Sequence, residues 1–234
     1  MGTDKYSLKS CLVKGWNAFK SNPTVSVLGS FLLIIIIPIS FPIFLQAPFI
    51  GSGTTLALNL VNRNAAVPDV FSGFRKFSLF MGVFWLHMLG IGVFAIPGGI
   101  GGYLILEWGS DALKVNPLAE NVIPFVIGIV VVIISVIMWL ILVVSKWLFV
   151  FFIVADDWND KSILAAFKKS STITKGNRVK LLLSFLLLWL FAISGAIIFF
   201  VGILVTTPIA VCAMASIYQE LKTRQEASSR LGCT

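Results

Sequence analysis

The chain has 234 residues, of which 58% are hydrophobic and 12% are charged, whereas a soluble domain carries about 25% charged residues. Its 18 Lys and Arg residues outnumber its 10 Asp and Glu residues and give a formal net charge of +8. Several apolar runs reach the roughly 18–20 residues that cross a bilayer core. This composition excludes an ordinary soluble domain and predicts an all-α, polytopic membrane protein.

Six apolar segments predict transmembrane helices that form three hairpins within a single integral membrane domain, 1–234. The expected spans are residues 24–45, 48–62, 79–106, 122–154, 179–204 and 205–221. Pro38 and Pro42 predict a kink in the first span, because proline removes a backbone donor. Thr206–Thr207–Pro208 predicts the turn between the last two spans. The run 122–154 is expected to form one long, tilted helix.

Three amphipathic segments predict helices that lie at the membrane surface, at about residues 7–21, 69–78 and 162–175. Apolar residues of the first, including Trp16, fall on one face at helical spacing. The second has a phenylalanine at every third position, and Gly176 is expected to stop the third. These helices are expected on the cytoplasmic side.

The distribution of positive charge predicts the topology. Sixteen of the 18 Lys and Arg residues lie in the N-terminal segment, in 63–78, in 161–180 or in the C-terminal tail. The positive-inside rule places these four segments in the cytoplasm. We therefore expect a multi-pass protein of the plasma (cytoplasmic) membrane with both termini in the cytoplasm. The lysines spread through residues 1–21 do not fit a cleavable signal peptide, so the first span is expected to remain as an anchor.

The three hairpins share a layout of amphipathic helix, span, proline near the turn and returning helix. The prolines are Pro48, Pro117 and Pro208. The layout is repeated but the residue identities are not, so two interpretations stay open. One is a true internal repeat, and the other is the pattern of any hairpin-rich membrane protein.

Short motifs in both halves of the chain carry a resemblance to a known family. In the first half these are Gln46-Ala47-Pro48-Phe49-Ile50-Gly51 and Asp69-Val70-Phe71-Ser72-Gly73-Phe74. In the second half these are Ala155-Asp156, Ala165-Ala166-Phe167-Lys168-Lys169-Ser170, Thr174-Lys175-Gly176-Asn177, Pro208 and Tyr218. The chain resembles bacterial six-helix membrane proteins of unknown function, which are similar to the membrane domain attached to some glycerophosphoryl diester phosphodiesterases. The resemblance implies a fold and no activity, because this chain has no room for the hydrolase domain.

A cluster of basic residues is the most informative candidate site. The cluster comprises Lys161, Lys168, Lys169, Lys175, Arg178 and Lys180. Each such residue near an anionic membrane surface is attracted by about 1 kcal/mol, so these residues are candidates for contact with lipid headgroups. The same charges could serve only as a topology signal. Nucleic-acid binding is not expected.

Two ionisable residues fall within the apolar runs. His87 is the only histidine, and an ionisable residue inside a membrane suggests a functional site. A neutral histidine that bonds to another helix is the alternative. Lys146 either extends its ammonium to the inner interface or faces the bundle and pairs with anionic lipid or substrate.

Three function classes follow, in decreasing order of preference. The first is a non-enzymatic membrane protein that organises anionic lipid, or a partner protein, at the cytoplasmic leaflet; a homo-oligomer is possible. The second is a small-solute transporter or channel, which would place Pro97–Gly102, His87 and Lys146 around one polar cavity. The third is an intramembrane enzyme, but His87 has no evident catalytic partner. Cys11, Cys212 and Cys233 show no metal-binding spacing, and no cofactor or metal is expected.

Overall fold

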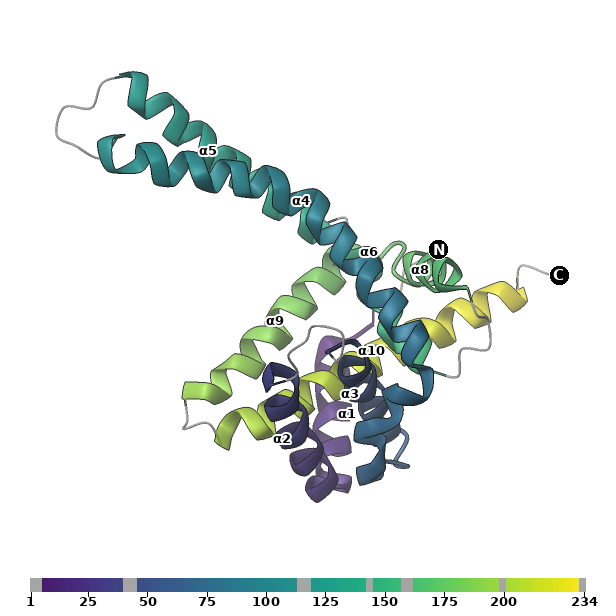
Figure 1. Ribbon diagram of the computed structural model, residues 1–234. Coiled ribbons are helices and arrows are strands. Elements are labelled where there is room, and N and C mark those ends of the chain that lie inside the picture. The colour runs from purple at the N-terminus through teal and green to yellow at the C-terminus, as the bar shows by residue number, and fades with distance from the viewer. Residues whose placement is uncertain are drawn as a thin grey trace. The chain divides into compact units, whose positions relative to one another are not determined.

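A computed structural model describes residues 6–39, 46–112, 119–141, 145–156, 162–197 and 201–231. These residues form helices and contain no strand, which confirms the predicted all-α class (Figure 1). The elements are α1 (Leu8–Ser21), α2 (Pro23–Ile39), α3 (Gln46–Val61), the 3₁₀ helix η2 (Val67–Lys76), α4 (Phe77–Ala112), α5 (Ala119–Trp139), α6 (Ser145–Trp147), α7 (Val150–Ala155), α8 (Ile163–Ile173), α9 (Arg178–Ile197) and α10 (Val201–Leu231).

Several helical stretches in the described ranges have the length and hydropathy that a membrane span requires. Four qualify by themselves: Val67–Gly109, Val122–Trp139, Arg178–Gly195 and Gly202–Arg230. The pair Leu8–Ser21 and Pro23–Ile35, bent by 99°, makes a fifth if it counts as one broken span. The structure therefore indicates a membrane protein with four to five candidate spans. The predicted second span corresponds to α3, whose 16 residues are too few for this group.

The chain divides into two compact units. Unit 1 comprises Met1–Phe84 and Lys146–Thr234, and unit 2 comprises Trp85–Ser145. In unit 1, α10 packs against α9, α1, α3 and α2, while α3 also packs against η2 and α7. Side chains of α3, α7 and α10 fill the interior, including Leu60, Val150, Ile153 and Ile217.

Polar contacts join distant parts of unit 1. The Asp156 carboxylate accepts hydrogen bonds from the Tyr218 hydroxyl at 2.9 Å and from the Lys222 ammonium at 2.7 Å. The Lys76 ammonium donates to the backbone carbonyl of Val154 at 2.9 Å. These contacts tie η2 and α10 to the segment around α7.

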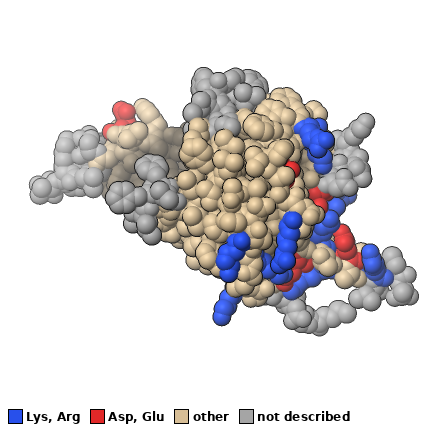
Figure 2. All heavy atoms as spheres, turned by 90° about the horizontal axis from the view of Figure 1, so that it is seen from below, with Lys and Arg blue, Asp and Glu red and all other residues tan. Residues whose placement is uncertain are grey.

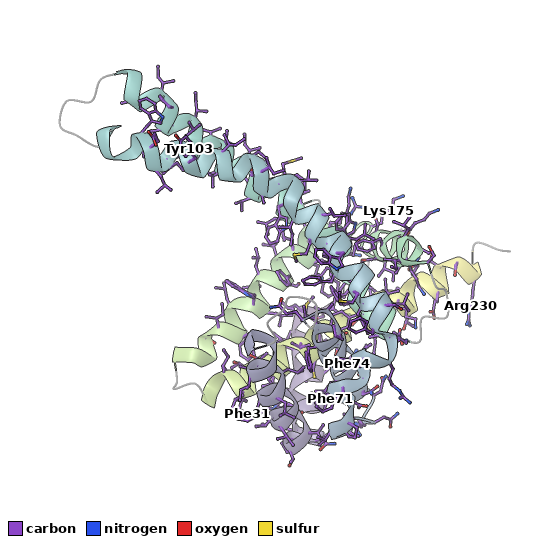
Figure 3. The ribbon with its side chains drawn as sticks, viewed as in Figure 1. Phe31, Phe71, Phe74, Tyr103, Lys175 and Arg230 are labelled. Atoms are coloured by element: carbon purple, nitrogen blue, oxygen red, sulfur yellow. The ribbon has the colours of Figure 1, made fainter. Side chains whose placement is uncertain are left out.

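The outer surface of unit 1 exposes apolar side chains that water alone would not favour. Phe31 of α2 and Phe71 and Phe74 of η2 are 44%, 51% and 38% exposed (Figure 3). Lys and Arg side chains, with acidic side chains among them, gather over one part of the face in Figure 2, and a broad area of that face carries no charge. A surface of this kind suits contact with lipid.

Unit 2 is built from most of α4 and from α5, which lie side by side (Figure 1). The two helices approach most closely at Gly101 and Gly128. A Cβ atom placed on Gly128 would lie 2.7 Å from the Gly101 carbonyl oxygen, so this contact requires glycine. Pro97 lies inside α4, and the helix continues past it as the sequence predicts.

The predicted turn at Thr206–Thr207–Pro208 is wrong, because these residues lie inside α10, which begins at Val201. The Thr206 hydroxyl contacts the backbone carbonyls of Gly202 and Ala192 at 3.0 and 2.9 Å. Threonine hydroxyls and neighbouring helices help a membrane helix to tolerate proline, so Pro208 does not end this one. The polar segment after Lys222, expected as a tail, continues α10 to Leu231.

The predicted single helix over 122–154 is also wrong. The α-helix α5 ends at Trp139, and the short helices α6 and α7 follow after a gap in the described residues. Val150 and Ile153 of α7 are almost fully buried in unit 1. Burial of these side chains stabilises a short core helix, and an all-apolar sequence does not distinguish this role from a membrane span.

The other predicted segments overlap helices of the structure, although α4 continues past the predicted end at residue 106 to Ala112, and three further differences follow. Helix α1 buries Cys11, Gly15 and Ala18, whereas Trp16 on the predicted apolar face is 44% exposed. The segment predicted at 69–78 is a 3₁₀ helix. Helix α2 continues through Pro38 to Ile39, while Pro42 and Pro117 lie outside the described residues.

Candidate functional site: a basic turn between α8 and α9

A tight turn connects α8 to α9, and we call its residues, Lys175–Lys180, the basic turn. The backbone N–H of Thr174 donates to Ser170 at the end of α8, and that of Leu181 donates to Asn177 at the start of α9. Gly176 between them has φ of +85°, a value that glycine adopts without steric cost. The sequence therefore fixes the turn locally, and Gly176 stops the helix as predicted.

Packing on both sides holds the basic turn in place. The Ser170 hydroxyl donates to the backbone carbonyl of Lys146 at 2.8 Å. The rings of Trp147 and Phe167 meet edge to face, with centroids 4.9 Å apart. On the other side of the turn, Leu181 of α9 is fully buried. The turn is thus anchored on both sides by buried side chains.

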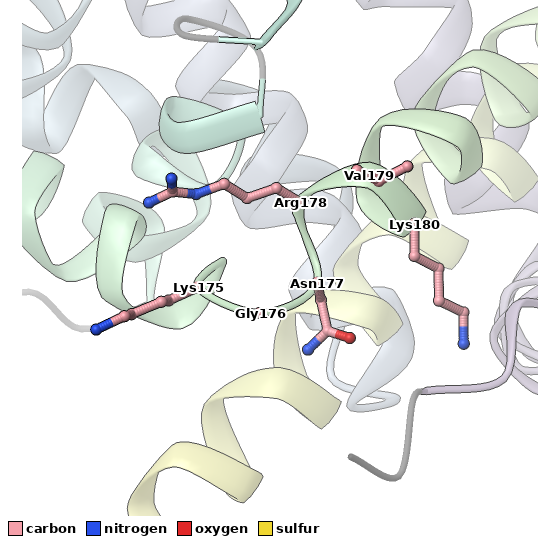
Figure 4. A pocket seen from close by; sticks show the side chains of 6 residues that line it. All are labelled: Lys175, Gly176, Asn177, Arg178, Val179 and Lys180. Atoms are coloured by element: carbon pink, nitrogen blue, oxygen red, sulfur yellow. The ribbon is translucent and has the colours of Figure 1, made fainter.

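The six residues of the basic turn line a hollow of about 390 Å³ (Figure 4). Lys175, Arg178 and Lys180 contribute three positive charges to its lining. Helix α9 begins at Arg178, and the first backbone N–H groups of a helix carry partial positive charge. The electrostatics of the hollow therefore favour an anion.

Two of the three cations have contacts that set their direction. The Arg178 guanidinium donates to the Ser171 hydroxyl at 3.4 Å. The Lys180 ammonium donates to the backbone carbonyl of Tyr6 and lies 4.4 Å from the centroid of the Tyr6 ring. The Tyr6 and Ser184 hydroxyls are 2.8 Å apart. Burial raises the pKa of the Tyr6 hydroxyl, so this group stays neutral at physiological pH.

Two polar atoms of the basic turn are buried without a hydrogen-bond partner in the described structure. They are Oδ1 of Asn177 and Nε of Arg178. A buried polar atom that makes no hydrogen bond costs about 1–3 kcal/mol. The contacts among the described residues therefore do not satisfy every polar group of this turn.

An exposed apolar stripe on α9 begins at the basic turn. Val179, Leu183, Leu187 and Leu190 are 74%, 56%, 55% and 58% exposed. Their spacing of three or four residues places them along one side of the helix. Positive charge and exposed apolar surface thus meet at one end of α9, as a phospholipid with its charged head and apolar chains requires.

The structure brings together only part of the predicted basic cluster. Lys175, Arg178 and Lys180 line the hollow. Lys168 is exposed on α8, and Lys169 is half-buried and interacts with other residues. Lys161 lies outside the described residues. Of the two predicted intramembrane residues, Lys146 belongs to unit 1 and His87 to unit 2. Among the described residues, no group of three or more His, Cys, Asp or Glu side chains could hold a metal ion.

Sequence reasoning missed Tyr6 and Ser184, which contact each other across 178 positions of the chain. No local pattern marks such a pair, because each residue is ordinary in its own segment. Asp156 and Tyr218 appear in the sequence analysis only among the motifs of the family resemblance. In the structure, the Tyr218 hydroxyl donates a hydrogen bond to the Asp156 carboxylate.

In comparisons with known proteins, no family model, no curated protein and no solved structure matches the chain.

Proposed function

We propose that the protein binds the headgroup of an anionic phospholipid at its basic turn and organises such lipid in the cytoplasmic leaflet, without enzymatic activity. The observation that carries this proposal is the position of the three cations at the start of the exposed stripe on α9. A phosphate in the hollow would leave the acyl chains free to lie along Val179, Leu183 and Leu187. A soluble anion would use the charges but not the stripe.

The proposal includes a topology. The chain crosses the plasma (cytoplasmic) membrane in six spans and three hairpins, as in the resembled family, with both termini in the cytoplasm. Helices α1, η2 and α8 lie at the inner surface, which places the basic turn at the depth of headgroups. The bend of 99° between α1 and α2 supports this arrangement, since a surface helix and a spanning helix are nearly perpendicular.

The size of the expected effect follows from the charges. Each Lys or Arg near an anionic surface contributes about 1 kcal/mol, so Lys175 and Arg178 together contribute about 2 kcal/mol. At 1.4 kcal/mol per factor of ten, this corresponds to roughly 30-fold in lipid affinity. Such a difference separates a bound lipid from one that exchanges during purification.

A transporter or channel is the alternative, and the contacts of unit 2 favour the lipid proposal. Gly98 and Gly101 of the glycine-rich stretch face side chains or backbone of α5, while Ile96 and Ile100 are exposed. These residues therefore contribute to helix packing and to an apolar surface. A protein partner at the basic turn is the other alternative, and the exposed apolar stripe beside the charges favours lipid.

Native mass spectrometry after gentle detergent extraction tests the proposal. The wild type is compared with the double variant Lys175→Ala/Arg178→Ala and with the control Arg63→Ala/Arg75→Ala, which removes the same charge elsewhere. We expect the first variant to lose bound phosphatidylglycerol by roughly 10- to 100-fold and the control to retain it. Equal retention in all three proteins would show that the basic turn is only a topology signal.

A further inference from the structure

The three cations of the basic turn do not extend in the same direction. Figure 4 shows Lys175 and Arg178 extending to one side of the turn, whereas Lys180 extends to the other side. The ammonium of Lys180 reaches the N-terminal segment, where the backbone carbonyl of Tyr6 accepts its hydrogen bond and the Tyr6 ring lies beneath it. Lys175 and Arg178 thus lie on one side of the hollow, where Arg178 also contacts the Ser171 hydroxyl. Lys180 is held by Tyr6 on the other side.

The contact that engages Lys180 is buried and has several components. Tyr6 is fully buried, its ring lies beneath the ammonium, and its hydroxyl is 2.8 Å from that of Ser184, which is 2% exposed. Tyr6 directly precedes Ser7, whose side chain caps α1 by accepting from the N–H of Ser10. The start of α1 is therefore attached to the first turns of α9, and it holds Lys180 there.

We propose that Tyr6 is a positioning residue that determines which anionic lipid the basic turn prefers, by holding Lys180 away from the headgroup. This inference rests on the proposed function. Removing one cation from the headgroup weakens binding of a phosphodiester with one negative charge, such as that of phosphatidylglycerol, less than binding of a more highly charged headgroup. A phosphomonoester, which carries about −1.5 to −2 charges at pH 7, loses more from the absence of the third cation, so the preference shifts toward the phosphodiester.

Release of Lys180 would change this preference. A third cation near the headgroup strengthens binding of any anionic lipid by about fivefold, and more for a headgroup with two charges. Variants that weaken the Tyr6 contact should therefore raise the ratio of phosphatidic acid to phosphatidylglycerol retained by the protein. The proposal requires that the ratio changes only when Lys180 is present. A general loosening of the fold would change the ratio with or without Lys180.

The test is a double-mutant cycle on the full chain. Wild type, Tyr6→Ala, Lys180→Gln and the combined variant are extracted into detergent containing equal amounts of phosphatidic acid and phosphatidylglycerol, and bound lipid is counted by native mass spectrometry. We expect Tyr6→Ala to raise the ratio of the two lipids by about three- to tenfold and Lys180→Gln to cancel the increase. An unchanged ratio in Tyr6→Ala, or an increase that persists in the combined variant, would overturn the inference.

Two milder variants keep the test decisive if Tyr6→Ala fails to fold. Tyr6→Phe and Ser184→Ala each remove one hydroxyl and leave the ring in place, so each should raise the ratio by about twofold, again only when Lys180 is present. A ratio that stays at the wild-type value in both would also overturn the inference. The variant Lys175→Ala/Arg178→Ala distinguishes failure of lipid binding at the basic turn from failure of the proposed role of Tyr6. If it loses phosphatidylglycerol while the Tyr6 variants change nothing, the proposed function stands and the role of Tyr6 falls.

Discussion

Units 1 and 2 are both rich in apolar helices, but they use them differently. Unit 2 contains a single Lys or Arg residue, Lys114, and its helices expose large apolar side chains such as Leu89, Leu106 and Ile123. Unit 1 contains all other Lys and Arg residues and joins its helices by polar contacts such as Tyr218 to Asp156. The difference teaches that apolar composition identifies a membrane protein, whereas the specific contacts of its polar residues identify a site.

The same contrast separates single helices. In the most apolar 18-residue window of α10, 56% of the residues are buried inside the protein, against 11% in α5. Helix α10 is therefore a core element of unit 1, whereas α5 buries few of its residues. Mutations should affect the two helices to different extents.

The largest expected effect is a truncation in the core of unit 1. Ile217 of α10 is fully buried, and Ile217→Ala should destabilise the fold by about 2–5 kcal/mol. The melting temperature in detergent should fall by roughly 5–15 °C. Ile133 of α5 is 51% exposed, and the matched variant Ile133→Ala should change the melting temperature by less than about 2 °C. Equal losses would show that α5 is as buried as α10.

A somewhat smaller effect is expected at the close contact of unit 2. Gly128→Val would place a side chain against the Gly101 carbonyl and cost about 1–3 kcal/mol through overpacking. A Cβ on Gly99 meets no atom within 4 Å, so Gly99→Val is the control. Thermal unfolding measures both. Lipid retention at the basic turn should be unchanged in Gly128→Val, and its loss would show that the units depend on each other.

The next largest loss of stability is expected when a polar contact of unit 1 is removed. Asp156→Ala removes the acceptor of Tyr218 and Lys222, at a cost of about 1–2 kcal/mol because Asp156 and Lys222 are partly exposed to solvent. Asp156→Asn retains an acceptor for Tyr218 and should cost about half as much. Thermal unfolding of both variants checks the order. Equal stability of the wild type and Asp156→Ala would mean that these bonds contribute nothing.

The smallest effect is expected on the polar surface of α10. The Arg224 guanidinium and the Glu220 carboxylate are 2.7 Å apart on one exposed helix face, at i, i+4 spacing. Such pairs contribute about 0.3–0.5 kcal/mol, so Arg224→Ala should shift the melting temperature by no more than about 2 °C. A drop of the size expected for Ile217→Ala would reveal a role for Arg224 that this ion pair does not explain.

The sequence predicts the fold class and most helices, because hydropathy and the helix stop at Gly176 act locally. It does not predict which apolar helix is central. Helices α5 and α10 are both long and apolar enough to be candidate spans, and only their packing partners show that α10 is the buried one. Pro208 does not mark a turn, because proline interrupts a helix less strongly when the helix is packed against others in a membrane protein. In the candidate site, the local sequence identifies Lys175 and Arg178, but the role of Tyr6 depends on a contact between distant segments.

Lipid photocrosslinking in vesicles tests the central claim most directly. Phosphatidylglycerol with a diazirine in its acyl chain is incorporated with the protein, and labelled peptides are identified by mass spectrometry. Helix α5 is the control, since it is more apolar and more exposed than α9 but has no basic turn among the described residues. We predict that label on α9 exceeds label on α5, falls on competition by unlabelled phosphatidylglycerol but not by phosphatidylcholine, and is lost in Lys175→Ala/Arg178→Ala. Equal labelling of α9 and α5 in wild type and variant would contradict a specific lipid site at the basic turn.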